Sequence, residues 1–450
     1  RFATANEGDW KGGSRGFTIF SADGKVLFDS GNALDHLAMR LGHYPEKRSA
    51  AKGSEPEGIE VGTFGERRVL FVGTERASLV AVYVDEGEGR APRFVQALPG
   101  GVAPEGLLAI PERRLFVTAS EKDLREDGGI GSVVTIYQEQ EAPAAYPTLQ
   151  SAADDAGRPI PWGAISGAVA DATVPGRLYA VTDSAYAQGR ILTIDATKTP
   201  ATIVAAQTVT EGGKPAKGLD LEGIALRDGG GFWLVSEGNP EGKKGPSENL
   251  LIAVDAGGAI EKTVRLPAPA AASATRFGFE GVTVTGKGAG ERVWIAQQRP
   301  WKDDAANTTK LYAYSPATGA WGAVRYPLEK ADKGWVGLSE ITALGDEGVV
   351  VIERDNGIGR DAKVKALMFV PAAELKPAAL GGDLPVVKKQ PLRDLLPELA
   401  APKGYVQDKV ESFAVDAQGN GFAITDNDGV DDASGETLFL RLGPVAAPKS

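Results

Sequence analysis

The feature that most constrains this chain is a glutamate–glycine pair that opens an apolar stretch and recurs along the sequence. The pair occurs at residues 57–58, 105–106, 222–223 and 280–281, each time before a run of apolar residues. Looser copies begin at Glu340 and Glu411, and another at Trp162 keeps the glycine but has tryptophan in place of glutamate. The copies lie roughly 50–70 residues apart, a spacing typical of propeller blades with some long loops.

A second apolar stretch follows each copy and ends in charged or amide residues. Examples are residues 68–76 (RVLFVGTER), 114–122 (RLFVTASEK), 231–237 (GFWLVSE), 349–356 (VVVIERDN) and 421–428 (GFAITDND). Adjacent strands of a hairpin run antiparallel, so the start of the first and the end of the second lie at the same edge of a sheet. If such sheets are arranged radially, these polar residues meet on one face around a central channel.

These patterns predict an all-β fold, a β-propeller with seven or eight blades of four-stranded antiparallel sheets, in a single domain over residues 1–450. The 58 glycines and 28 prolines, set between short apolar runs, agree with this expectation. No run of 18 apolar residues occurs, so we expect no membrane span.

The net charge, the lack of cysteine and the scarcity of histidine restrict the partners and the metal sites that this chain can have. The net charge of −11 argues against nucleic acid as a partner, because phosphate backbones require a basic surface. The absence of cysteine excludes disulfides, thiolate zinc sites and cysteine nucleophiles. With only two histidines, a metal must be held mainly by oxygen ligands, which favours Ca²⁺, with Mg²⁺ as the alternative.

Two stretches resemble known families. Residues 162–443 resemble the bacterial "esterase-like activity of phytase" family, which implies a propeller and a phosphate-ester hydrolase. The phrases that carry this resemblance are 221–225 (LEGIA), 232–237 (FWLVSE), 279–282 (FEGV), 335–341 (WVGLSEI), 352–356 (IERDN) and 425–428 (TDND).

The first part of the chain, residues 1–137, resembles the choice-of-anchor I domain of secreted bacterial alkaline-phosphatase-like proteins. Its phrases are 4–9 (TANEGD), 28–31 (FDSG), 52–58 (KGSEPEG) and 103–107 (APEGL). This resemblance implies an exported protein, secreted or periplasmic, and strands upstream of Arg1. Within the single expected domain, residues 1–141 supply the blades of this type and residues 162–443 the phytase-like blades.

The recurring glutamates predict a metal site on the propeller axis. Carboxylates that converge repel one another unless cations compensate them, and carboxylate oxygens suit Ca²⁺. The predicted ligands are Glu57, Glu105, Glu222, Glu280, Glu340 and Glu411. The alternative is that each glutamate accepts backbone N–H bonds from the adjacent blade or pairs with arginine.

The ends of the second strands predict a phosphate-binding and catalytic set. Arginine binds phosphate through two parallel hydrogen bonds and lysine binds it as a point charge. The predicted residues are Arg76, Lys122, Arg299, Arg354, Glu340, Glu353 and, from the connection before the first glutamate–glycine pair, Lys52. Alternatively, these cations only neutralise the neighbouring glutamates.

A late acidic turn adds two further candidate ligands, Asp426 and Asp428. Alternating oxygen ligands and a turn glycine suit a Ca²⁺ loop, although the closing glutamate of an EF-hand is missing. The alternative is a turn stabilised by aspartate and asparagine side chains.

Taken together, the sequence predicts a secreted, calcium-dependent hydrolase of small phosphate esters, phytase-like or phosphodiesterase-like, with its site on the axial face. A non-catalytic extracellular propeller, which binds or scaffolds and uses calcium only for stability, stays open as the alternative. A carboxylesterase is disfavoured, because no Gly-x-Ser-x-Gly elbow occurs and histidine is scarce. The sequence leaves the oligomeric state open.

Overall fold

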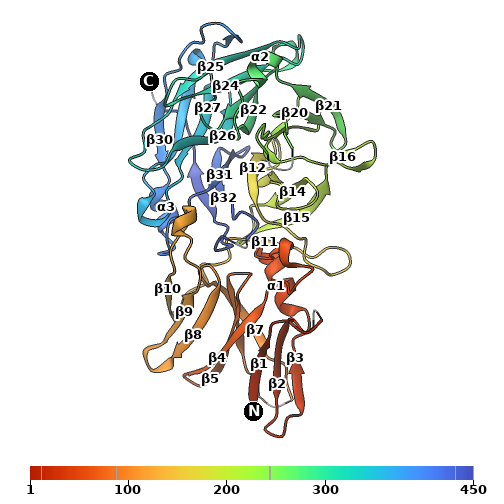
Figure 1. Cartoon of the computed structure of the whole chain (residues 1–450), viewed down its shortest axis with the longest axis vertical. Helices are drawn as coiled ribbons and strands as arrows, with labels where there is room; N and C mark the ends of the chain where they lie inside the picture. Colours follow the sequence, from red (N-terminus) through yellow and green to blue (C-terminus); the bar gives the residue numbers. More distant parts are fainter. Residues whose placement is uncertain (12, 88, 243–244, 431, 449–450) are drawn as a thin grey trace. The chain divides into compact units, whose positions relative to one another are not determined.

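The structure, a computed structural model, describes residues 1–11, 13–87, 89–242, 245–430 and 432–448. It is mostly β and consists of small antiparallel sheets (Figure 1). The chain divides into two compact units, and this differs from the single domain expected over residues 1–450. Unit 1 comprises residues 1–164 and 427–437, and unit 2 comprises residues 165–426 and the chain from Leu438 onward. None of the described helices is both long and apolar enough to cross a membrane.

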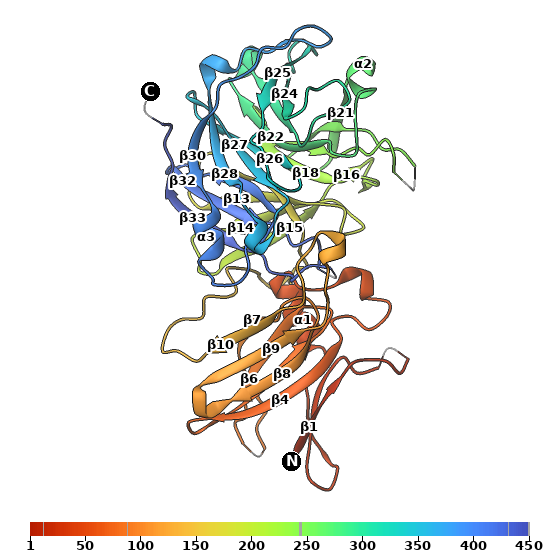
Figure 2. The ribbon, with the colours of Figure 1, turned by 60° about the vertical axis from the view of Figure 1, so that its left-hand side comes forward.

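The described residues of unit 1 form three sheets. Figure 2 labels β4, β6 and β7 of the second sheet and all strands of the third, β8–β10. A helix, α1 (Ala33–Leu41), follows the first sheet, and β11 (Leu149–Ser151) follows the third. In strand order the sheets are β1 (Phe2–Asn6), β2 (Gly16–Phe20) and β3 (Val26–Asp29); β4 (Pro56–Phe64), β5 (Arg67–Thr74), β6 (Leu79–Val84) and β7 (Arg93–Pro99); β8 (Pro104–Ile110), β9 (Leu115–Ser120) and β10 (Val134–Gln138).

Unit 2 contains five successive sheets. The first three are β12 (Ile165–Ala170), β13 (Arg177–Thr182), β14 (Arg190–Asp195) and β15 (Ala201–Thr208); β18 (Leu221–Leu226), β19 (Phe232–Ser236), β20 (Leu250–Val254) and β21 (Ile260–Arg265); β22 (Phe279–Thr285), β23 (Arg292–Gln297), β24 (Thr308–Tyr314) and β25 (Trp321–Pro327). The last two are β26 (Val336–Leu344), β27 (Gly348–Asp355), β28 (Lys365–Pro371) and β30 (Gln390–Asp394); β31 (Val410–Val415), β32 (Asn420–Thr425) and β33 (Phe439–Pro444).

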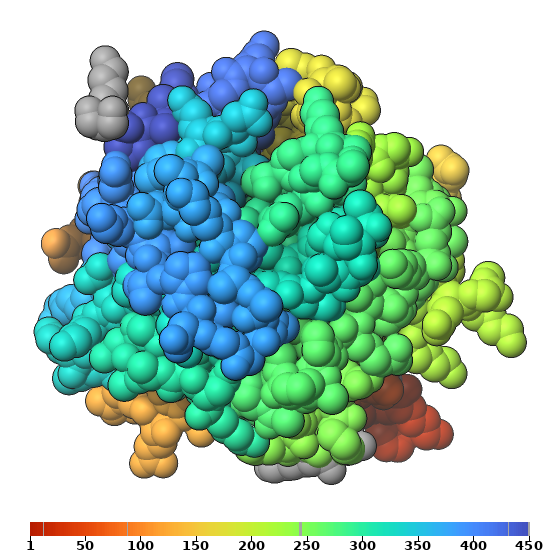
Figure 3. Space-filling model, turned by 90° about the horizontal axis from the view of Figure 1, so that it is seen from above, coloured from red at the N-terminus to blue at the C-terminus, as the bar shows by residue number. Residues whose placement is uncertain are grey.

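Smaller elements connect these sheets. A hairpin of β16 (Thr210–Glu211) and β17 (Lys214–Pro215) precedes β18, and the short helices α2 (Ala268–Ala271) and α3 (Leu396–Ala400) precede β22 and β31. The strand β29 (Ala378–Ala379) is added to the third sheet beside β25. In the space-filling view from above, the blue segment of the chain lies against the green and teal segments of that sheet (Figure 3).

The first strands of the five sheets of unit 2 contact one another in a closed circuit. Going round it, β12 contacts β18, β18 contacts β22, β22 contacts β26, β26 contacts β31, and β31 returns to β12. A circuit that closes with five strands leaves no position in it for the first strands of unit 1. This is the physical reason that one ring through all the predicted repeats does not form.

The glutamate–glycine pair is a β-bulge in the first strand of a sheet. In β18, Leu221 pairs with Ser236 and Gly223 pairs with Val235, so Glu222 is an extra residue in the ladder. A bulge turns its side chain away from the regular alternation. The glycine allows the next strand of the circuit to approach closely, because a Cβ at Gly223 would lie 2.5 Å from the carbonyl oxygen of Glu280.

The same register shift identifies the equivalent residues of the other repeats. The residues at the bulge are Glu57, Glu105, Ser166, Glu222, Glu280, Ser339 and Glu411. The repeats assigned to Trp162 and Glu340 are therefore placed differently, since serine occupies the bulge in β12 and β26. Glu340 takes the position that is glycine in β18.

Candidate functional site

A cavity of about 390 Å³ opens in unit 2 among the polar ends of its first and second strands. Seven of its lining side chains are carboxylates and three are cationic, so the cavity has a net negative formal charge. The lining residues are Asp183, Glu222, Glu237, Asn239, Arg276, Phe277, Glu280, Gln298, Trp335, Arg354, Asp408, Lys409, Glu411 and Asp426.

Three neighbouring carboxylates lie close enough to share a metal ion. Asp220, Glu222 and Glu237 each offer an oxygen, and these oxygens all lie within 4.8 Å of one another. Asp220 and Glu222 come from the start of β18, and Glu237 directly follows β19, so the hairpin of the second sheet brings them together. The oxygen donors and their negative charge fit Ca²⁺.

The backbone fixes two of these carboxylates. The N–H of Gly278 donates to Oε1 of Glu237 at 2.7 Å, and the N–H of Ser184 donates to Oδ1 of Asp220 at 2.9 Å. These donors come from the connections before β22 and after β13. The carboxylate cluster therefore joins three consecutive sheets of the circuit.

Burial and mutual repulsion raise the pKa values of the carboxyl groups of Glu222 and Glu237. Burial raises the pKa of Glu237 to about 8, although the N–H of Gly278 acts in the opposite direction. Burial, then the charges of Glu280 and Glu237, raise the pKa of Glu222 well above its usual value. At neutral pH such carboxyl groups retain protons unless a cation takes their place.

Arg354 also lines the cavity and is held at two points. Its Nε donates to Oγ of Ser339 at 2.7 Å, and its Nη2 donates to Oε1 of Glu411 at 2.5 Å. Its Nη1 forms no hydrogen bond to any described residue of the protein, and the side chain lines the cavity. The guanidinium group is therefore oriented with donors left for a ligand anion.

Two further carboxylates that line the cavity, Glu411 and Asp426, lie beside Lys409. The Nζ of Lys409 lies 3.4 Å from Oδ2 of Asp426. Burial by itself raises the pKa of Glu411, but Lys409 and Arg354 offset this effect and the pKa is lowered. Glu411 is thus an ionised partner of Arg354, whereas the sequence had predicted it as a metal ligand.

Three arginines stack on two aromatic rings that line the cavity, Phe277 and Trp335. The guanidinium carbon of Arg299 lies 3.9 Å from the ring centroid of Phe277 and 4.7 Å from that of Trp335. Arg276 covers the Phe277 ring at 4.6 Å and Arg354 covers the Trp335 ring at 5.3 Å. Such stacking desolvates and orients a guanidinium group.

Glu340, predicted as both a metal ligand and a catalytic residue, lies elsewhere. It is 1% exposed and is not among the residues that line the cavity. Its carboxylate accepts the N–H groups of Ile341 at 2.9 Å and Ala168 at 3.2 Å. The N–H groups of Phe413 and Val282 also bond it, so it joins four of the five first strands. The alternative interpretation, a glutamate that accepts backbone bonds, describes this residue.

Glu353, predicted as catalytic, points away from Arg354 because neighbouring residues of a strand face opposite sides of the sheet. It is fully buried and accepts hydrogen bonds from the Tyr326 hydroxyl at 3.0 Å and from Lys389 Nζ at 2.5 Å. These partners come from β25 of the third sheet and from the connection before β30. This residue is a structural ion-pair partner.

The other predicted residues belong to unit 1. Glu57 and Glu105 are at bulges of β4 and β8, and Lys52 pairs with Glu7. Burial and the charge of Glu75 raise the pKa of Glu57 to about 7. These glutamates are therefore not members of the circuit of unit 2 that holds Glu222, Glu280 and Glu411.

The predicted cations of unit 1 also have carboxylate partners there. Arg76 Nη2 lies 3.1 Å from Oε1 of Glu75, and Lys122 Nζ lies 2.9 Å from Oδ1 of Asp432. These pairs agree with the alternative in which the cations neutralise nearby acids.

The predicted calcium loop is split between the units, because Asp426 belongs to unit 2 and Asp428 to unit 1. Asn427 between them is structural. Its Oδ1 accepts the N–H of Ala164 at 2.7 Å, and its Nδ2 donates to the carbonyl of Gly42 at 2.7 Å.

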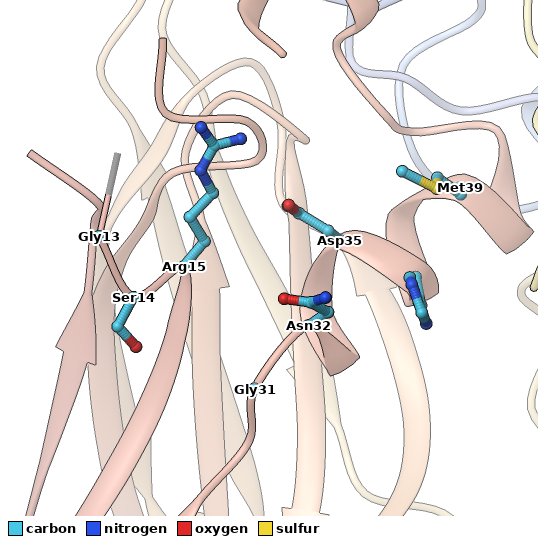
Figure 4. Close-up of a pocket in the computed structure, with 8 residues that line it drawn as sticks. Gly13, Ser14, Arg15, Gly31, Asn32, Asp35 and Met39 are labelled. Atoms are coloured by element: carbon cyan, nitrogen blue, oxygen red, sulfur yellow. The ribbon is translucent and has the colours of Figure 1, made fainter. Parts of the chain in front are cut away.

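A smaller cavity of about 280 Å³ lies in unit 1 beside α1 (Figure 4). Its main polar groups already have partners. Arg15 donates to the carbonyl oxygens of Ser49 and Ala51 at 3.1 and 2.9 Å, and Asp35 accepts the N–H of Ser54 at 3.2 Å. We therefore place the candidate site in unit 2.

Several residues of the site were missed from the sequence. Glu237 ends a second strand, like the residues that were predicted, and Asp220 stands two positions before Glu222. Both positions follow from the same rule, that polar residues at strand ends converge. Arg276 had no such signal, because it lies in the connection between α2 and β22.

Comparison with known proteins identifies two matching families. The model of the family described as "esterase-like activity of phytase" matches residues 160–429, and that of the choice-of-anchor I domain matches residues 2–88. Both predicted resemblances are confirmed, the second over a shorter stretch. No curated protein sequence matches the chain.

Solved structures show only low overlaps. Hydrazine synthase of Kuenenia stuttgartiensis is 12% identical, with 86% of this chain and 95% of that chain covered and a TM-score of 0.35. A putative 6-phosphogluconolactonase from Bacteroides uniformis is 17% identical, with coverages of 72% and 85% and a TM-score of 0.29. TM-scores this low support no conclusion about this chain.

Proposed function

The chain belongs to the family described as "esterase-like activity of phytase", and from this premise we propose that unit 2 is a calcium-dependent hydrolase of phosphate esters. Membership of the family suggests hydrolase activity. The finer proposal rests on one observation, namely that two members of a cluster of three carboxylates, Glu222 and Glu237, line the same cavity as an oriented arginine, Arg354. We interpret the closed circuit of five first strands as a five-bladed propeller that places both groups at its axial mouth.

Asp220, Glu222 and Glu237 would hold the ion. A bound Ca²⁺ would neutralise these carboxylates and polarise a phosphoryl oxygen. The residues of the chain perform the other tasks. Arg354, fixed by Ser339 and Glu411, binds the phosphoryl oxygens through its open Nη1.

Glu280 is another carboxylate that lines the cavity. Glu280 accepts a hydrogen bond from Nε2 of Gln298 at 2.5 Å and lies beside Glu237, whose charge raises its pKa after the larger effect of burial. A carboxyl group that keeps its proton near neutral pH suits protonation of a leaving alcohol. Glu280 is the residue we propose for this role.

The test is hydrolysis of p-nitrophenyl phosphate and bis-p-nitrophenyl phosphate with and without Ca²⁺. We expect turnover that depends on Ca²⁺ and is lost in Glu237→Gln and Arg354→Ala. Glu248→Gln is the matched control, since this exposed carboxylate of unit 2 pairs only with Arg265 among the described residues. Turnover that persists in chelator, or that both site variants retain, would refute the proposal.

A second candidate, a non-catalytic propeller with structural calcium, is favoured by one feature. The carboxylate cluster is bonded to the connections of three sheets, so an ion there would hold the sheets together. Calcium would then raise the unfolding temperature while both esters stay intact. We also propose an extracellular or periplasmic location, because calcium sites of extracellular modules work at about 10⁻⁴–10⁻³ M of the ion.

A further inference from the structure

Two arginines stack on Phe277, a residue that lines the cavity; Arg276 also lines the cavity, whereas Arg299 reaches it through its contacts with Phe277 and Trp335. Among the described residues, neither Arg276 nor Arg299 forms an ion pair or a side-chain hydrogen bond; both stack on Phe277, at 4.6 and 3.9 Å. Arg354, which also lines the cavity, is paired with Glu411. The two adjacent guanidinium groups therefore lack a carboxylate partner in the described part of the chain, although the chain has a net charge of −11.

The two guanidinium groups are close enough to repel each other. Burial, followed by the charge of Arg276, lowers the pKa of Arg299. A bound anion between or beside two such groups would relieve this repulsion and form hydrogen bonds with both. Both guanidinium groups lie against the Phe277 ring, so the ring supports the two arginines.

The connection that carries Arg276 and Phe277 is anchored. The carbonyl oxygen of Phe277 accepts the indole N–H of Trp301 at 2.7 Å, and the next residue, Gly278, donates its N–H to Glu237. Arg299 contacts both Phe277 and Trp335, and the centroids of these two rings lie 5.9 Å apart. The arginines are therefore presented from a fixed backbone at one edge of the carboxylate cluster.

From these contacts we propose that Arg276 and Arg299, supported by Phe277, form a second anion-binding subsite at the rim of the cavity. The subsite takes a further anionic group, phosphate, sulfate or carboxylate, carried on the alcohol part of the ester. Its role in substrate selection rests on the proposed function, whereas the binding itself does not. Phe277 is a positioning residue in this subsite.

The first experiment measures binding without turnover. Sodium sulfate is titrated calorimetrically into the full chain at low ionic strength with Ca²⁺ present. We expect Arg276→Gln and Arg299→Gln each to weaken sulfate binding about tenfold, the loss of one charge-assisted hydrogen-bonding partner. Lys302→Gln, which removes another cation near the same connection, is the control and leaves the affinity unchanged.

A second comparison isolates the ring. Phe277→Leu keeps an apolar side chain but removes the stacking surface, and we expect it to weaken sulfate binding about threefold or more, whereas Phe277→Tyr restores wild-type affinity. Should Phe277→Leu fail to fold, Arg276→Gln still decides, because the Arg276 side chain is exposed.

Substrate preference supplies the last measurement. We expect a lower KM for 4-carboxyphenyl phosphate than for phenyl phosphate in the wild type, and no such difference in Arg276→Gln. Sulfate binding without hydrolysis would retain the subsite and refute the hydrolase. The subsite is overturned if the wild type binds no sulfate, if both arginine variants bind it normally, or if Lys302→Gln loses as much affinity.

Discussion

Replacement of Glu340 by glutamine tests whether this carboxylate is a structural centre of unit 2. Its two oxygens accept N–H groups from β12, β22, β26 and β31. Glutamine has nearly the same shape but only one acceptor oxygen, and its amide group would face N–H donors. About two of the four bonds would be lost, and each buried N–H left without a partner costs about 1–3 kcal/mol.

We therefore expect Glu340→Gln to lower the free energy of unfolding of unit 2 by about 2–6 kcal/mol. Burial raises the pKa of Glu340 well above its usual value, and the four N–H groups act against that rise. If burial dominated and the group were protonated, glutamine would replace it at little cost. The variant thus also reports the protonation state of this carboxyl group.

The assay is urea unfolding followed by tryptophan fluorescence and far-ultraviolet circular dichroism, in chelator so that no metal effect enters. Glu248→Gln is again the matched control, because it makes the same chemical change at an exposed position and should leave the midpoint unchanged. A loss below about 1 kcal/mol for Glu340→Gln, the size of an ordinary substitution, would refute this account.

Three other predictions concern the site and the strands that support it. Burial raises the pKa of Glu237 to about 8 from 4.5, so the calcium-free fold loses stability as the pH rises through this interval. Because calcium displaces that proton, the calcium-induced rise in melting temperature should be larger at pH 8 than at pH 5, and equal rises would contradict this prediction. In Arg354→Lys, the lysine ammonium cannot keep the bond to Ser339 together with the other contacts of the guanidinium group. We expect KM for p-nitrophenyl phosphate to rise about tenfold in steady-state assays, the effect of one lost charge-assisted bond. An unchanged KM would count against this prediction. Gly223→Ala brings a Cβ to 2.5 Å from a backbone oxygen and should destabilise by about 1–3 kcal/mol in urea unfolding, whereas Gly404→Ala, with open space around it, should not.

The recurring glutamate–glycine pair was enough to predict antiparallel sheets whose first strands share one design. It could not predict how many sheets one ring contains, because closure depends on packing between neighbouring sheets rather than on spacing in the sequence. The approach of Gly223 to the backbone of Glu280 is such a contact, and it becomes evident only once the strands are placed.

The candidate site could be predicted in part. Glu222, Glu280, Glu411, Asp426 and Arg354 were expected at one mouth, and all five line the cavity. Their individual roles could not be predicted, since pairing with a cation or backbone group depends on the side to which each strand turns its residues.

The assignment of Glu340 shows this limit most clearly. In sequence it resembles the other glutamates, but it stands one position after the bulge and so points to a different place. Only the ladder register separates it from Ser339.

At each bulge in unit 2, one side chain lies outside the residue pairs that form the sheet. Because the extra residue lies outside the ladder, serine at Ser166 and Ser339 and glutamate at Glu222 fit the same backbone. Exchanges at these positions can therefore alter the charge of the mouth while the surrounding strands keep their partners.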